Sequence, residues 1–162
     1  MDPGIRTGLP REHPIVKSME KLDELFSGSD IIIIGVESDS LFSKSTLTKL
    51  SLFNDSLASN SLLSKVTSIF NHKLIIPDDM GFNIESVLDQ IPSDSIQLAS
   101  LSERVEKSGI IGNLVSKDFE TMCFVGQINS SFEYDEFEFR KSIFELVNKF
   151  NGPENFYVSS LP

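Results

Sequence analysis

The chain has 162 residues, of which 24 are acidic and 14 are basic, so its formal net charge at pH 7 is −10. Hydrophobic residues make up 40% of the sequence and charged residues 23%, a composition that can bury a core and is not typical of a disordered tail. The acidic balance argues against binding to nucleic acids or anionic lipid headgroups. The single cysteine, Cys123, excludes an intrachain disulfide framework and a zinc site built from several cysteines.

The first 29 residues are expected to form a lead-in followed by one helix. Three prolines restrict residues 1–14 to an extended conformation. Residues 15–26 carry apolar side chains at helical spacing, and Ser27-Gly28 is a plausible end for that helix.

No basic region followed by an apolar run marks a signal peptide in this sequence. The longest apolar run, Ile31–Ile34, is far shorter than the roughly 20 residues of a membrane span. Taken at face value, the chain is a soluble domain. The irregular ends, over residues 2–14 and 159–162, instead suggest a soluble piece excised from a larger protein.

Residues 30–162 are expected to form the main folded unit. The β-branched run over residues 30–37 predicts a buried central strand. Ser43 is the expected N-cap of a helix that continues to about Ser59. Alternating polarity over residues 65–70 predicts a second strand. The helix between these strands is expected to bury an apolar stripe formed by Leu47, Leu50, Phe53 and Leu57.

An insertion is expected over residues 71–115, with a turn at residues 77–81 and little regular structure around it. A third helix follows, capped by Ser93 or Asp94 and ended by Gly109. We expect this helix to turn Leu98, Leu101 and Val105 inward. Two strand-like runs over residues 110–115 and 122–128, joined by the turn residues Ser116-Lys117-Asp118, predict a hairpin.

Asp135 or Ser131 is expected to open the last helix, which ends at Asn151-Gly152-Pro153 and precedes a strand over residues 156–159. The residues expected to face inward are Ile143, Phe144, Val147 and Phe150. Without the insertion, the order is strand, helix, strand, strand, helix, strand. This order predicts an α+β fold, a ferredoxin-like split βαβ sandwich in which both helices cover one face of an antiparallel sheet.

No group of residues indicates catalysis. Asp78, Asp79 and Glu85 lack the spacing of a calcium loop and are interpreted as part of a solvated turn. Cys123 has no histidine nearby in the sequence and is interpreted as a small buried apolar residue. The acidic cluster at residues 133–138 suits a helix N-terminus. The sequence therefore predicts no catalytic residue, no metal site, no cofactor and no enzymatic activity.

Several short segments match a known family in their order along the chain. They are Leu9-Pro10 with Pro14, Phe26-Ser27-Gly28, the strand Ile31–Val36, Val66-Thr67-Ser68, Leu114–Asp118, and Ser160-Leu161-Pro162. Together they resemble the first extracytoplasmic loop of the RND superfamily, in its predicted-exporter (MMPL-like) branch. Ser160 departs from the glycine that the family carries before the second membrane helix.

The resemblance implies a porter-type domain on the periplasmic side of a cell membrane, between transmembrane helices 1 and 2 of a proton-driven exporter. It implies alternating access for hydrophobic or amphiphilic compounds, with the proton-coupling residues outside this chain. The implied partners are the remaining porter subdomains and membrane helices of the same transporter, an apolar small molecule or lipid, and a second copy in a homo-oligomer. The sheet face without helices is expected to be uncovered and to pack against a sister subdomain.

Met80, Phe82 and Ile84, beside the expected turn, are the candidate residues of a substrate cleft. The alternative function is a stand-alone ferredoxin-like regulatory domain that binds a small ligand, and an enzyme on the same fold is a third reading. The flanking gene sequence separates these readings, because an exporter requires an apolar segment of about 20 residues on each side.

Overall fold

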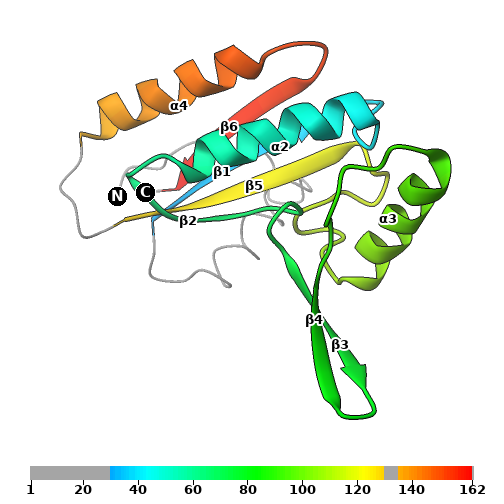
Figure 1. Cartoon of the computed structure of the whole chain (residues 1–162). Coiled ribbons are helices and arrows are strands. Elements are labelled where there is room, and N and C mark those ends of the chain that lie inside the picture. The colour runs from blue at the N-terminus through cyan, green and yellow to red at the C-terminus, as the bar shows by residue number, and fades with distance from the viewer. Residues whose placement is uncertain (1–29, 130–134, 162) are drawn as a thin grey trace.

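The computed structural model describes residues 30–129 and 135–161 (Figure 1). The described residues form three helices and two antiparallel sheets, so the expected α+β class is confirmed. The expected lead-in, the expected N-terminal helix and the alternative cap Ser131 lie outside the described residues.

The larger sheet has four strands in the order β2-β5-β1-β6, and each pair of neighbours is antiparallel. They are β1 (Ile31–Glu37), β2 (Leu63–Thr67), β5 (Thr121–Ile128) and β6 (Asn155–Leu161). The predicted central position of β1 is confirmed, because β1 pairs with β5 on one side and β6 on the other. The isoleucine-rich sequence of β1 suits this place, since a central strand has side chains packed on both faces.

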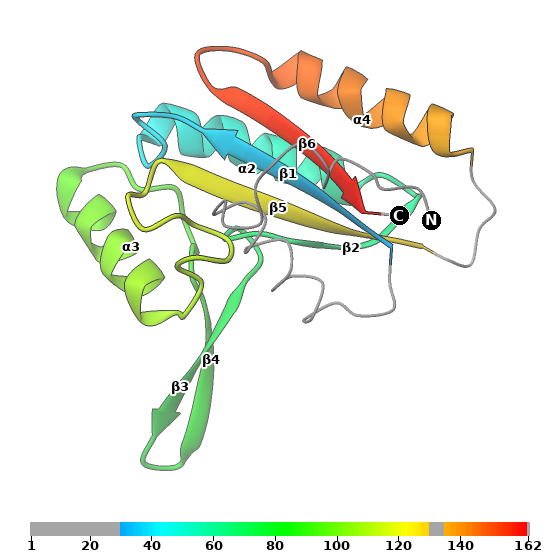
Figure 2. The ribbon, with the colours of Figure 1, turned by 180° about the vertical axis from the view of Figure 1, so that it is seen from behind.

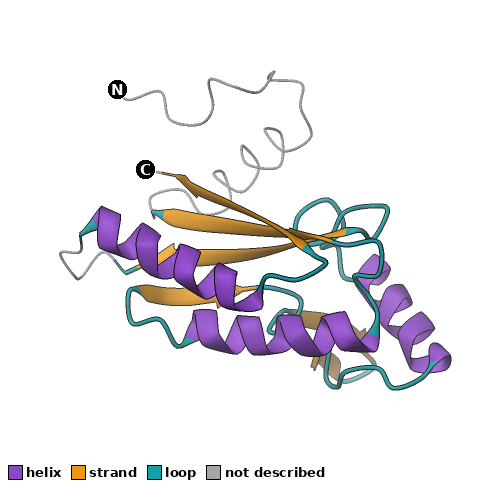
Figure 3. Cartoon of the chain, turned by 90° about the horizontal axis from the view of Figure 1, so that it is seen from above, coloured by secondary structure: helices purple, strands orange, loops and turns teal. Residues whose placement is uncertain are grey.

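Helices α2 (Lys44–Ala58) and α4 (Glu136–Phe150) lie side by side on one face of this sheet (Figure 3). Ser43 caps α2 as predicted, and its side chain accepts a hydrogen bond from the backbone N–H of Thr46. The predicted apolar stripe of α2 is fully buried. At its centre Phe53 makes edge-to-face contacts with the rings of Phe124, Phe150 and Phe156, at centroid distances of 5.1, 5.4 and 5.3 Å.

The opposite face of the sheet is not open at its centre, contrary to expectation. Phe124 contacts α2, so Ile34, its partner across β1 and β5, also faces the helices. Ile33 and Val125 point to the other side because strand residues alternate between faces. Their exposed fractions are only 8% and 0%. Both faces of the sheet are therefore packed at the centre.

Asp135 caps α4, and its carboxylate accepts hydrogen bonds from the N–H groups of Phe137 and Glu138. Of the two predicted caps, Asp135 is therefore confirmed. Ile143 and Val147 face inward as predicted, together with Phe139, and Phe150 is half-buried against Phe53. The prediction for Phe144 is wrong, since that side chain is 52% exposed. The buried face follows positions 139, 143 and 147, and Phe144 lies one residue, about 100°, around the helix.

The insertion is more regular than expected. Residues 71–92 contain two paired strands, β3 (Lys73–Asp78) and β4 (Gly81–Ser86), which the sequence analysis did not identify. The predicted turn does join them, and Gly81 has a φ of +142°, which favours glycine. We call residues 73–86 the arm, because the ribbon projects away from the main sheet in two opposite views (Figures 1 and 2).

The third helix, α3 (Ser95–Lys107), forms as predicted, with Asp94 as its N-cap and Gly109, at a φ of +73°, just after its C-cap. Leu101 and Val105 are buried, and Leu98 is half-buried.

The strand predicted over residues 110–115, as the first half of a hairpin with residues 122–128, does not form. The N–H groups of Asn113 and Leu114 bond to the carbonyl of Ile110, which makes turns in place of a strand, and only isolated bridges remain. The second strand is also shifted. β2 ends at Thr67, and Ser68 begins a turn in which its carbonyl accepts a hydrogen bond from the N–H of His72.

Candidate binding surfaces on the arm and at its base

Met80, Phe82 and Ile84 all lie on the arm, and they are not among the residues that line the depression described below. Their exposed fractions are 96%, 65% and 62%. Met80 belongs to the turn at the tip, whereas Phe82 and Ile84 belong to β4. The structure therefore places them together on one projecting element, with their side chains directed to solvent.

The strand register divides the arm into two different faces. Ile75 pairs with Ile84 and Pro77 pairs with Phe82, so these four apolar side chains share one face. We call this set the apolar face of the arm. The other face holds more polar pairs, formed by Leu74 with Glu85 and Ile76 with Asn83.

Charged groups mark the two ends of the arm. At the base, Lys73 pairs with Ser86 on the side of the apolar face, and its ammonium group donates a hydrogen bond to the Ser86 hydroxyl at 2.7 Å. At the tip lie Asp78 and Asp79, and the carboxylate of Asp78 accepts a hydrogen bond from the N–H of Met80. On the side of the apolar face the base therefore carries the ammonium group of Lys73, while the turn at the tip carries two carboxylates.

Arg104 of α3 joins the base of the arm to the body, by which we mean the described residues outside the arm. Its guanidinium donates to the backbone carbonyl of Ser86, and it lies 3.4 Å from the carboxylates of Glu85 and Asp89. Both acidic residues are exposed, so these ion pairs contribute little on their own. The bond to the Ser86 carbonyl is stronger than a hydrogen bond between two neutral groups, because its donor is charged.

An open depression of about 480 Å³ lies beside the base of the arm. Its wall combines apolar side chains from the loop after β4 and from α3 with polar groups, among them Arg104 and Asp89. The ten lining residues are Val87, Leu88, Asp89, Gln90, Pro92, Ile96, Gln97, Ser100, Leu101 and Arg104. This depression could not be found from the sequence, since no spacing along the chain indicates that the loop packs against α3.

The structure does not assemble a metal site from the acidic residues considered above. Within residues 30–129 and 135–161, no three histidine, cysteine, aspartate or glutamate side chains come close enough to hold an ion. Asp78 and Asp79 are exposed at the tip of the arm, and Glu85 lies beside Arg104.

Cys123 and His72 are not activated by their surroundings. Burial of the half-buried Cys123 raises the pKa of its thiol to about 11, so the thiolate that a nucleophile requires is disfavoured at neutral pH. Burial lowers the pKa of His72, which keeps its imidazole neutral. Neither group has the paired acid or base that nucleophilic catalysis requires among the interactions described here.

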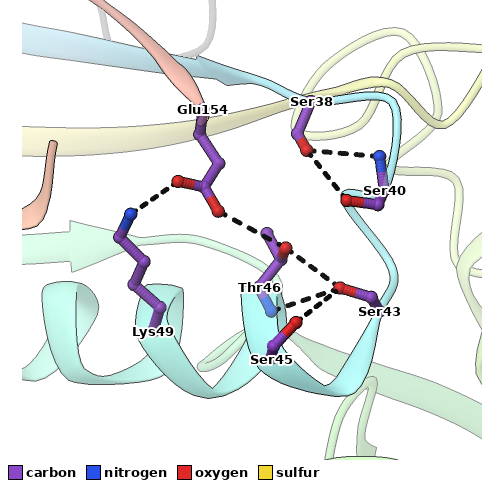
Figure 4. A network of polar contacts seen from close by, with 7 residues as sticks. All are labelled: Ser38, Ser40, Ser43, Ser45, Thr46, Lys49 and Glu154. Atoms are coloured by element: carbon purple, nitrogen blue, oxygen red, sulfur yellow. Dashed lines mark hydrogen bonds and ion pairs between the residues drawn. The ribbon is translucent and has the colours of Figure 1, made fainter. Parts of the chain in front are cut away.

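A polar network joins the start of α2 to the loop before β6 (Figure 4). The Lys49 ammonium group donates to the Glu154 carboxylate at 2.5 Å, and the Thr46 hydroxyl donates to its other oxygen at 3.4 Å. Ser43 extends the network by donating to Thr46 at 3.0 Å. Glu154 is only 4% exposed, and each of its carboxylate oxygens is paired. We interpret the network as a structural connection between helix and sheet.

Comparison with known proteins gave no relative on which to base an identification. No protein-family model matches the chain, and neither a curated protein nor a solved structure matches it. Among the helices of the described residues, none combines the length and apolar character that crossing a membrane requires.

Proposed function

We propose that this chain is an extracytoplasmic porter domain of an RND-type membrane exporter, with a ferredoxin-like core that moves as one body during transport. The proposal begins with the resemblance of its segments, in their order, to the first extracytoplasmic loop of the MMPL-like branch. It assigns the chain no catalytic role, and it assigns proton coupling to membrane helices outside these 162 residues.

The connectivity of the main sheet supports the ferredoxin-like core. β1 and β2 both run antiparallel to β5, so they are parallel to each other, joined through α2, with β5 between them. β5 and β6 have the same relation through α4, with β1 between them. Two interleaved βαβ units are what a split βαβ arrangement requires, so this connectivity supports the proposed core.

The observation that carries most weight is the pairing of the first and last residues of the main sheet. Ile31 at the start of β1 lies opposite Leu161 at the end of β6. The chain therefore enters and leaves the sheet at the same end. This geometry suits a domain inserted between two consecutive membrane helices, because both connections return to one membrane surface.

Alternating access requires domains that tilt without deforming. A sheet packed at the centre of both faces suits this motion, since close-packed interiors transmit displacement as a unit. The depression beside the arm is our candidate contact for the transported compound, because its wall combines apolar side chains with polar groups and so suits an amphiphile.

The location of the full-length protein tests this proposal. With an antibody against this domain, we expect the protein to remain in the membrane pellet after an alkaline carbonate wash and to dissolve only in detergent. Protease added to intact spheroplasts should destroy the epitope while a cytosolic marker stays whole. A protein recovered in the soluble fraction, or an epitope protected until lysis, would favour the small-ligand regulatory domain and overturn the exporter.

Transport itself provides the second measurement. Deletion of the gene should raise cellular retention of an amphiphilic fluorescent dye, and the intact gene should restore efflux. Equal retention in the deletion strain and its parent, across dyes of different charge, would contradict the proposed activity.

A further inference from the structure

The apolar face of the arm presents an unusual amount of apolar surface to solvent. Ile75, Phe82 and Ile84 are 70%, 65% and 62% exposed, although a two-stranded ribbon is at best marginally stable alone in water. A contiguous exposed apolar patch usually marks an interaction site. A site for a small apolar molecule is usually concave. This face is one side of a projecting ribbon, so its shape suits another protein surface better.

The arm disfavours pairing along its edge. Pro77 removes one N–H group from β3, and proline in an edge strand hinders the addition of a further strand. Association through the face of the ribbon remains available, because Pro77 itself contributes apolar surface there opposite Phe82.

We propose that the apolar face docks against the same face of a second copy of this chain, with the two arms antiparallel. The charges at the ends of the arm support this occupant. Lys73 marks the base on the side of the apolar face, and Asp79 lies in the turn at the tip. In an antiparallel pair related by two-fold symmetry, each Lys73 lies near the partner's tip, and the apolar residues meet in the middle.

The net charge of −10 does not prevent this contact. At about 0.15 M salt, charges more than roughly 8 Å apart are largely screened, so the groups at the ends of the arms matter more than distant ones. An anionic lipid surface suits the apolar face less well than a second copy does, because the carboxylates of Asp78 and Asp79 at the tip would be repelled by it. The face has four apolar residues, fewer than the roughly 20–30 residues that each partner contributes to a standard interface, so we expect weak and reversible dimerisation.

Sedimentation equilibrium of the full 162-residue chain in 0.15 M NaCl tests the docking. We expect a concentration-dependent monomer–dimer equilibrium. Phe82→Asp should raise the dissociation constant roughly tenfold or more, because it places a charge in the apolar contact. Asn83→Asp is the matched control: it adds the same charge at the next position on the other face and should change the constant less than about threefold.

Charge reversal tests the antiparallel orientation. Lys73→Glu alone and Asp79→Lys alone should each weaken dimerisation, and the double variant should restore it, because both contacts are then reversed together. Thermal unfolding of each variant checks that the body stays folded.

Three results would overturn the proposal. They are a chain that remains monomeric at 1 mM, a dimer that Phe82→Asp and Asn83→Asp weaken equally, and a double variant as weak as the single ones. Flotation of the monomer with anionic vesicles would identify a lipid occupant and would overturn it as well.

Discussion

Arg104 on α3 donates a hydrogen bond to the backbone carbonyl of Ser86, the last residue of β4. This contact joins helix α3 to the base of the arm, at the end of β4. The same guanidinium borders the depression, so one side chain belongs to both candidate surfaces.

Replacing Arg104 should loosen the arm more than the body. In Arg104→Ala we expect faster hydrogen exchange over residues 73–86 and unchanged exchange in β5, because about 1 kcal/mol is lost from the local opening of the arm and not from global unfolding. Hydrogen–deuterium exchange followed by mass spectrometry measures both regions at once. Lys107→Ala is the control on the same helix, since Lys107 pairs with exposed Glu103 in an i,i+4 contact. Equal exchange in the arm of both variants would contradict the anchoring role.

Glu154 should make folding stability depend on pH. Burial raises the pKa of this carboxyl, but hydrogen bonds from Lys49, the backbone and Thr46 outweigh burial, and the folded-state pKa lies below its ordinary value. The folded state therefore binds fewer protons than the unfolded state, so this contribution is present above the unfolded pKa of about 4.3 and is lost as pH falls through the folded pKa.

In Glu154→Gln we expect roughly 2 kcal/mol lower stability at pH 7, less than for a fully buried pair because Lys49 is 26% exposed. The difference from the parent chain should shrink as pH falls below about 4. Denaturant unfolding at pH 7, 5 and 3.5 measures it. Glu103→Gln removes an exposed ion pair and serves as the comparison. A Glu154→Gln deficit that stays constant across this pH range would show that ionisation of Glu154 is not its cause.

The helix starts and the central place of β1 could be predicted because their signals are local. Ser43, Asp94 and Asp135 each satisfy free N–H groups within three residues, so the sequence near each cap contains the relevant information. The central place of β1 followed from its unbroken β-branched run, since such a run suits burial on both faces.

The arm and the depression could not be predicted in the same way. Residues 73–78 read KLIIPD, where adjacent isoleucines break the alternation of a half-buried strand and Pro77 argues against a strand. The depression arises where the loop after β4 meets α3, and that contact depends on the fold of the whole insertion. Met80, Phe82 and Ile84 lie at or beside the predicted turn, and whether they bind a substrate stays a prediction.

Phe53 should be the most sensitive position of α2. Its ring contacts three other phenylalanine rings from β5, α4 and β6, and the side chain is fully buried. Phe53→Ala removes these contacts and leaves a cavity, so we expect a loss of about 3–5 kcal/mol in the free energy of unfolding. Leu52→Ala, one residue earlier and 57% exposed, should cost less than about 1 kcal/mol. Urea unfolding monitored by circular dichroism measures both, and similar costs would contradict the packing described for this face.

Cys123 should be protected from alkylation in the folded protein. Burial raises the pKa of its thiol to about 11, so at pH 8 the thiolate fraction is about 100-fold lower than for an ordinary thiol. Iodoacetamide labelling followed by mass spectrometry should therefore be slow in buffer and fast in urea. A second thiol introduced by Met80→Cys, at the 96% exposed tip of the arm, provides an internal reference in the same molecule. Because both thiols meet the same reagent, comparable labelling rates in the folded chain would contradict the raised pKa and the protection expected for Cys123.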